Sequence, residues 1–290
     1  MPPFTDEEVV AAFPEFHVTV PEIGRGNQKV VYRATADAEI ALKIMLWDIA
    51  TAGVDDDNDE EVDEAVERFH REIHGMTSVN CPHVIRVAHG PGTREIGNSS
   101  HYWYTEPFLV GGTLKDRLRS GPLPATDVER IANALLTAVQ AMWNEGRFVH
   151  RDIKPGNIGF LANGEVVLID LGIALFTEMN PITGSSVAGP GTWQYAAPEQ
   201  FDIKRLSNMD FRTDQFQIGI VLFEALFGVR PFNGYGAAYA ANLRSFDSSL
   251  LDDHRVTPGL RRLIPRLLAG SPSERYRRID AALEDLNGGI

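Results

Sequence analysis

The pattern of apolar and polar residues predicts a chain that starts with strands and continues with helices. Residues 16–23, 30–34 and 40–44 are rich in β-branched and apolar side chains, and a turn at 35–37 separates the last two segments. Apolar runs bounded by turn residues are typical of strands. We expect a further strand over 101–105, so that the first third of the chain contains a small β-sheet.

Helical periodicity takes over elsewhere. Apolar residues recur every three or four positions from Val62 to Met76, which predicts one helix after the third strand. A longer helix is expected between Asp127 and Glu145, because its apolar residues fall on one face. A buried helix should begin at Thr213.

Two local signals refine these elements. Thr5 followed three residues later by Glu8 matches a capping box, which predicts a short helix within residues 1–12 that we interpret as an N-terminal appendage. Asn163-Gly164 lies between the apolar runs 158–161 and 166–169, which predicts a hairpin with a two-residue turn.

Composition excludes several classes of protein. The contents of 43% hydrophobic and 23% charged residues are typical of a soluble globular chain, and the net charge of −13 argues against a nucleic-acid partner. No apolar stretch is long enough to span a membrane, and the N-terminus lacks the features of a signal peptide. The single cysteine, Cys81, excludes an internal disulfide and a cysteine-based zinc site, so we expect a cytoplasmic protein.

Much of the negative charge lies in an acidic run at 55–64. We interpret it as a solvated loop leading into a helix start, where acidic residues stabilise the positive end of the helix dipole. A calcium loop is the alternative, but the glycine and the spaced ligands of an EF-hand are absent.

The candidate chemistry lies between His150 and Asp170. Asp152, Asn157 and Asp170 supply two carboxylates and one amide within this short segment. Phosphoryl transfer from a nucleotide needs such groups, because a carboxylate orients and deprotonates the attacking hydroxyl while oxygen ligands hold magnesium.

The order of several motifs makes the chain resemble the catalytic domain of eukaryotic-like serine/threonine protein kinases, especially the bacterial ones. The motifs are Gly24-Arg25-Gly26, Ile40-Ala41-Leu42-Lys43, His150-Arg151-Asp152, Asp170-Leu171-Gly172 and Ala197-Pro198-Glu199. The resemblance covers residues 13–286 and implies an α+β, bilobal fold. It implies a small antiparallel sheet with one main helix over residues 13–105, a hinge over 106–112 and a larger, mainly helical lobe over 113–286.

The resemblance assigns roles in the C-terminal part of the chain. Asp152 would accept the proton of the substrate hydroxyl, and Lys154 would contact the γ-phosphate of ATP. Asn157 and Asp170 would hold Mg²⁺, with Mn²⁺ as a substitute. His150 would be a packed structural residue rather than a general base.

In the N-terminal part, the resemblance implies that Lys43 binds the α- and β-phosphates. Its carboxylate partner would be Glu72, and the acidic insertion leaves Glu67 as a rival. The family pattern puts the other nucleotide contacts at Gly24, Gly26, Val31, Ala41, Thr105, Glu106 and Phe108. Thr105 would be the gatekeeper at the back of the adenine pocket, and backbone groups near Glu106 and Phe108 would bind the adenine edge.

The chain departs from the family pattern in three places. Lys29 stands where the third glycine of the loop is usual, which either stiffens the loop or adds charge near the phosphates. Gly159 replaces the leucine expected beneath the adenine. Gly111-Gly112-Thr113-Leu114 begins the helix after the hinge one residue later than is usual.

Further resemblances concern specificity and control. Lys154 and Thr192 match residues of the serine/threonine branch, and Arg151 marks kinases that are controlled by a phosphate on the activation segment. The candidate phosphorylation sites in this segment are Thr177, Thr183, Ser185 and Ser186. Asp214 would anchor the backbone of the catalytic loop, and Arg275 would pair with Glu199.

The sequence therefore predicts a kinase that uses ATP and Mg²⁺ to phosphorylate serine or threonine of protein substrates and its own activation segment. Two other functions were weighed. A catalytically silent, nucleotide-dependent scaffold is favoured only by Lys29 and Gly159. A small-molecule phosphotransferase is disfavoured by Arg151, Lys154 and the Ala197-Pro198-Glu199 motif. The oligomeric state stays open.

Overall fold

The computed structural model describes residues 3–26, 28–48, 59–171, 175–176, 193–201, 209–234, 239, 241–243 and 246–288, and gives the backbone alone for 59–64, 175–176 and 193. The chain divides into two compact units. The N-terminal unit comprises Met1–Thr77 and Ile85–Val110, and the C-terminal unit comprises Ser78–Val84 and Gly111–Ile290.

The N-terminal unit contains an antiparallel five-stranded sheet in the order β1-β2-β3-β5-β4. The strands are β1 (His17–Arg25), β2 (Lys29–Thr35), β3 (Glu39–Met45), β4 (His89–Ile96) and β5 (Ser99–Pro107). The predicted strands are confirmed, although β5 is longer than the expected 101–105. Lys43 on β3 pairs with Val31 on one side and with Tyr104 on the other, which places it in the middle of the sheet.

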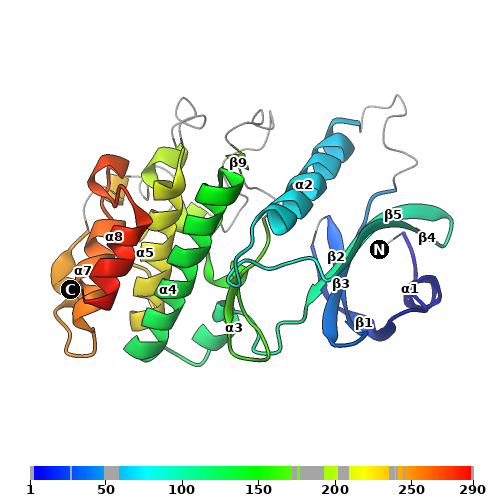
Figure 1. Ribbon diagram of the computed structural model, residues 1–290, viewed down its shortest axis with the longest axis horizontal. Helices are drawn as coiled ribbons and strands as arrows, with labels where there is room; N and C mark the ends of the chain where they lie inside the picture. Colours follow the sequence, from blue (N-terminus) through cyan, green and yellow to red (C-terminus); the bar gives the residue numbers. More distant parts are fainter. Residues whose placement is uncertain are drawn as a thin grey trace. The chain divides into compact units, whose positions relative to one another are not determined.

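The helix α1 (Asp6–Ala12) is part of the same unit (Figure 1). The predicted capping box is confirmed: Thr5 Oγ1 accepts from the Glu8 N–H at 3.2 Å, and a Glu8 carboxylate oxygen accepts from the Thr5 N–H at 2.7 Å. Val9 and Phe13 are fully buried in the cluster formed with the residues of the sheet. The helix therefore adds apolar burial to the unit.

The second helix of this unit is α2 (Asp59–Ser78), which confirms the helix predicted from the spacing of Val62 to Met76. It packs on β5, because the rings of Phe69 and Tyr102 stack with their centroids 4.7 Å apart. Glu72 on the same helix is 4% exposed, so its carboxylate is also buried in the unit.

The C-terminal unit is mainly helical, and Figure 1 shows its long helices side by side. They are α4 (Ala125–Ala141), α5 (Phe211–Phe227), α7 (Pro258–Leu267) and α8 (Ile279–Asn287), and the short helix α3 (Leu114–Leu118) lies apart from them. Residues 142–146 continue α4 as a π-helical turn. As predicted, α5 is a buried helix, and nearly all of its side chains from Thr213 to Leu226 are buried, polar ones included.

Two small ribbons complete this unit: β6 (Phe148–Val149) pairs with β9 (Leu175–Phe176), and β7 (Ile158–Phe160) pairs with β8 (Val166–Leu168). The second ribbon is the predicted hairpin, but the prediction of a two-residue turn is wrong, because the loop is one residue longer. The Leu161 N–H donates to the Glu165 carbonyl at 3.0 Å, which closes a three-residue loop. Gly164 adopts φ 81°, as the left-handed position of such a loop requires.

Short 3-10 turns link these elements, at Pro155–Asn157, Trp193–Tyr195, Pro198–Phe201, Ser248–Leu251 and Pro272–Glu274. The α+β class and the division into sheet-rich and helix-rich units are confirmed. Within the ranges that the structure describes, none of the helices combines the length and apolarity that crossing a bilayer demands.

Candidate active site

The backbone of the loop 150–154 is held by side chains of the buried helix α5. The Asp214 carboxylate accepts from the N–H groups of His150 at 2.9 Å and Arg151 at 2.8 Å, which confirms its predicted anchoring role. Gln217 accepts from the Ile153 N–H at 2.9 Å and donates to the Arg151 carbonyl at 2.7 Å. These bonds fix Arg151 at φ 66°, a left-handed conformation that persists only where its surroundings determine it.

This rigid loop presents Asp152 in a defined orientation. Its Oδ2 accepts from Lys154 Nζ at 2.7 Å and from Asn157 Nδ2 at 3.0 Å, and the residue is 7% exposed. Asp152 Oδ1 is buried and has no hydrogen-bond partner among the residues described. One carboxylate oxygen is thus occupied, and the other is the atom left to accept a proton.

Asp170 is brought to the same loop by β8. The Ile169 N–H donates to the Asn157 carbonyl at 2.9 Å, and a ring nitrogen of His150 lies 3.2 Å from the Ile169 carbonyl. Asp170 then turns out of the ribbon with φ 64°. The chain segments at residues 150, 157 and 170 therefore lie close to one another within the C-terminal unit.

The donor chemistry here fits a magnesium ion. Asn157 Nδ2 donates to the carbonyl and to the carboxylate of Asp152, which leaves the amide oxygen of Asn157 for a cation. That oxygen and the Asp170 carboxylate are the hard ligands that Mg²⁺ takes, with phosphate and water oxygens completing its shell. No group of three or more His, Cys, Asp or Glu side chains occurs among the described residues that would form a metal site by itself.

His150 is packed in the interior, as predicted. Its side chain is completely buried, and burial lowers its pKa because the charged imidazolium would lose its water. One ring nitrogen receives the Asp152 N–H at 3.2 Å. The imidazole therefore supports the loop backbone.

The anchor Asp214 predicts a pH effect on stability. Burial raises its carboxyl pKa to about 7, although the two backbone donors act in the opposite direction. Because the folded-state pKa lies above the unfolded value of about 3.9, the stabilising contribution is complete below that pH and is lost as the pH rises through 7. Between pH 5 and 8, the wild type should lose about 2–3 kcal/mol of unfolding free energy relative to Asp214→Asn. Urea unfolding of both proteins at the two pH values measures this, and a difference that is independent of pH would contradict it.

The ion pairs of the N-terminal unit differ from those expected. Lys43 Nζ lies 2.7 Å from Glu106 Oε1, whereas Glu72 binds Lys29 Nζ through both carboxylate oxygens, at 2.8 and 3.0 Å. The predicted Lys43–Glu72 pair is absent from the ion pairs of the described residues. Glu67, the rival, is an exposed residue that pairs with Arg71, so Glu72 is the buried one of the two candidates.

Thr105, the expected gatekeeper, has its side chain on the face of the sheet opposite to Lys43. Successive side chains of a strand point to opposite faces. Thr105 Oγ1 is bonded to the backbone N–H and a ring nitrogen of His89, at 2.9 and 3.0 Å, whereas its neighbours Tyr104 and Glu106 lie on the face of Lys43. The side chain of Glu106 therefore lies on the same face of the sheet as Lys43.

The backbone of Phe108, near which adenine contacts are expected, is hydrogen-bonded within the chain. Its N–H donates to the Glu39 carbonyl and its own carbonyl accepts from the Val110 N–H, both at 3.0 Å. The reason is that β5 extends to Pro107, so the chain leaves the sheet later than expected. The sequence indicates this extra residue at Gly111-Gly112, because the helix after the hinge begins one residue later than is usual.

The described residues of the glycine loop connect β1 to β2, as predicted. Gly24 pairs with Val31 across β1 and β2, and the Gly26 N–H donates to the Lys29 carbonyl at 2.9 Å. Ala41 pairs with Glu106 across β3 and β5, and Gly159 lies in β7. The predicted residues Gly172, Thr177, Thr183, Ser185, Ser186 and Thr192 lie outside the described residues.

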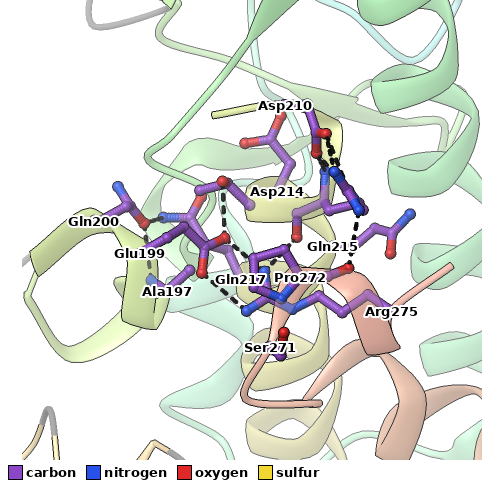
Figure 2. A network of polar contacts seen from close by, with 12 residues as sticks. Ala197, Glu199, Gln200, Asp210, Asp214, Gln215, Gln217, Ser271, Pro272 and Arg275 are labelled. Carbon is purple, nitrogen blue, oxygen red and sulfur yellow. Dashed lines mark hydrogen bonds and ion pairs between the residues drawn. The ribbon is translucent and has the colours of Figure 1, made fainter. Parts of the chain in front are cut away.

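The segment that begins at Ala197 is tied to the catalytic loop and to the end of the chain (Figure 2). Gln200 donates to the Arg151 carbonyl at 3.0 Å and accepts from the Ala197 N–H at 2.9 Å. The predicted pair is confirmed, with an Arg275 guanidinium nitrogen 2.6 Å from a Glu199 carboxylate oxygen. Sequence reasoning missed Gln200 and Gln217, which carry no charge signal.

A cavity of about 530 Å³ adjoins Lys154 in the C-terminal unit. Pro155 and Gly156 of the catalytic loop line it, as do Tyr195 and Glu224. The Tyr195 hydroxyl donates to the Glu224 carboxylate at 2.7 Å. The cavity gives a bulky substrate room beside the loop.

Comparison with known proteins adds independent findings. A family model described as protein kinase domain matches residues 17–285. The chain is 28% identical to the probable serine/threonine-protein kinase PknB of Lactococcus lactis, over 94% of this chain and 42% of the relative. It is 30% identical to the probable serine/threonine-protein kinase PknB of Bifidobacterium longum, over 92% and 39%, and 29% identical to serine/threonine-protein kinase PrkC of Bacillus subtilis, also over 92% and 39%. The chain spans about two fifths of the length of these relatives.

Proposed function

Because the chain belongs to the protein kinase domain family, we propose that it transfers the γ-phosphate of ATP to serine or threonine hydroxyls of proteins, with Mg²⁺ as the cofactor. The observation that carries this proposal is the arrangement around Asp152. A buried carboxylate with one occupied and one free oxygen sits on a loop whose backbone is fixed by Asp214 and Gln217.

Each residue of the loop has a chemical task. Asp152 Oδ1 accepts the proton of the substrate hydroxyl as that hydroxyl attacks phosphorus. Lys154, held 2.7 Å from Asp152 Oδ2, supplies positive charge to the transferred phosphoryl group. Asn157 and Asp170 would hold the magnesium ion, which when bound neutralises charge that develops on the phosphate oxygens.

The names of the relatives favour protein substrates over a small acceptor, because all of them specify serine/threonine-protein kinases. Arg151, adjacent to Asp152, would bind a phosphate on the 173–192 segment, which makes self-phosphorylation the expected route to activation. The single cysteine, Cys81, is a buried thiol rather than half of a disulfide, which fits a reducing compartment such as the cytoplasm.

The test is mass spectrometry of the purified chain after incubation with Mg²⁺ and ATP. We expect phosphate on serine or threonine of residues 173–192 in the wild type and none in Asp170→Ala, which lacks a metal ligand. A generic protein substrate in the same tube reports transfer in trans. ATP binding without labelling of either protein would favour the silent scaffold instead.

A further inference from the structure

We propose that the cavity beside Lys154 binds an acidic side chain of the protein substrate, and that Lys115 and Arg119 select it. The inference rests on the proposed function and narrows its substrate class, from proteins in general to those with Asp or Glu close to the acceptor hydroxyl. It concerns the C-terminal unit alone, which contributes the described residues that line the cavity.

Two cations of α3 line this cavity. Lys115 and Arg119 are four residues apart, and Arg119 keeps the α-helical conformation with φ −62° and ψ −26°. Residues at this spacing lie on the same face of a helix. The two side chains therefore form one positive patch on the wall of the cavity.

This patch adjoins the catalytic loop. The helix α3 packs on the 3-10 turn Pro155–Asn157, which directly follows Lys154. A Cβ placed on Gly156 would lie 4.0 Å from Lys115 Cδ, so the stem of Lys115 passes over the turn. A substrate whose hydroxyl lies at Asp152 would therefore bring its neighbouring side chains close to Lys115.

The acidic residue of the cavity wall is already engaged. Among the described residues that line the cavity, Glu224 is the one that carries a carboxylate. It accepts from the Tyr195 hydroxyl at 2.7 Å, and the Arg230 guanidinium lies 5.8 Å from the centre of the Tyr195 ring. A cationic substrate side chain that approached Glu224 would meet a carboxylate with a donor in place and a second cation nearby.

The cations of α3 are more available than this acid. Arg119 has an ion pair with Asp116 at 3.0 Å, but the two side chains are 72% and 46% exposed. Exposed pairs of this kind contribute little, so a substrate carboxylate can compete with Asp116 at small cost. Lys115 forms no ion pair with any residue that the structure describes. The positive charge that remains for a substrate is thus on α3.

The net charge of the chain has the opposite sign. A value of −13 would attract basic substrates at long range. At physiological ionic strength, however, exposed charges more than ~8 Å apart are largely screened from each other. For a side chain bound in the cavity, the cations of its wall therefore outweigh the net charge.

The experiment measures the binding of short labelled peptides to the full chain by fluorescence anisotropy. The peptides have alanine in place of the acceptor, and they carry one glutamate or one lysine at each flanking position in turn. At the best position, we expect the wild type to bind the glutamate peptide about threefold to tenfold more tightly than the lysine peptide, because exposed ion pairs replace repulsion. In Lys115→Glu with Arg119→Glu, the order of the two affinities should reverse.

Arg130→Glu with Arg261→Glu is the matched control, because it changes the net charge by the same amount. Both are exposed arginines of the C-terminal unit, and each has an ion pair with an aspartate, at 3.5 and 3.4 Å. The wild-type preference for glutamate should stay within about twofold in this control.

Thermal unfolding checks each fold, and Lys115→Ala with Arg119→Ala replaces the charge-reversal variant if that variant unfolds; the preference should then be lost. The proposal is overturned if the wild type prefers lysine peptides, if the affinities are equal at every position, or if the α3 variants keep the preference for glutamate. Because these peptides cannot be phosphorylated, their binding is independent of phosphoryl transfer, which is measured separately with the corresponding serine peptides.

Discussion

Replacing Asp152 with asparagine is expected to lower the rate of phosphoryl transfer by about 10²–10⁴-fold, the range that a positioned general base contributes. Asparagine keeps an oxygen that can accept from Lys154 and Asn157, as Asp152 Oδ2 does at 2.7 and 3.0 Å. The second position then carries an NH₂ group, which cannot take a proton from the substrate. The loop should keep its shape while the chemistry is lost.

The measurement is the initial rate of phosphate incorporation into a generic protein substrate at saturating Mg²⁺-ATP. Asp127→Asn is the matched control, because Asp127 is a partly exposed residue in the first turn of α4 whose carboxylate lies 3.5 Å from the Arg130 guanidinium. Its rate should stay within about twofold of the wild type, since exposed pairs of this kind contribute little. If Asp152→Asn kept more than a tenth of the wild-type rate, Asp152 would not be the base.

The elements that were predictable from the sequence are those set by local patterns. The capping box of Thr5 and Glu8, the apolar face of α4 and the buried helix α5 all follow from the spacing of a few residues. The roles of Asp214 and Arg275 were predictable from the resemblance of their motifs. Asp214 binds backbone N–H groups and Arg275 binds one carboxylate, and the fold fixes both contacts.

Ion pairing inside the sheet was not predictable, because it depends on which residue faces which. A shift of one residue along a strand moves every side chain to the other face. In the register that β5 adopts, Thr105 faces His89 and Glu106 faces Lys43. Two acids and two lysines that are distant in sequence, Glu72, Glu106, Lys29 and Lys43, could then pair in more than one way.

Replacing Arg275 with methionine should give the largest loss of stability, about 3–5 kcal/mol of unfolding free energy, because it leaves a buried carboxylate without its partner. Arg275 is 1% exposed, and its guanidinium donates to both oxygens of Glu199, at 2.6 and 3.0 Å (Figure 2). It also donates to the carbonyls of Arg212 at 2.8 Å and Ala269 at 2.9 Å, which would lose these bonds.

Chemical denaturation of Arg275→Met and of Arg261→Met tests this expectation. Arg261 is an exposed arginine with an ion pair to Asp252 at 3.4 Å, and its replacement should cost less than about 1 kcal/mol. The double variant Arg275→Met with Glu199→Gln should recover part of the lost unfolding free energy, because Glu199→Gln removes the unpaired charge. Its amide oxygen can still accept from the Thr213 hydroxyl, which donates to Glu199 at 2.9 Å. If Arg275→Met were as stable as the Arg261→Met control, another group would have to compensate the Glu199 carboxylate. The Arg275–Glu199 pair would then not be what holds residues 197–201 in place within the C-terminal unit.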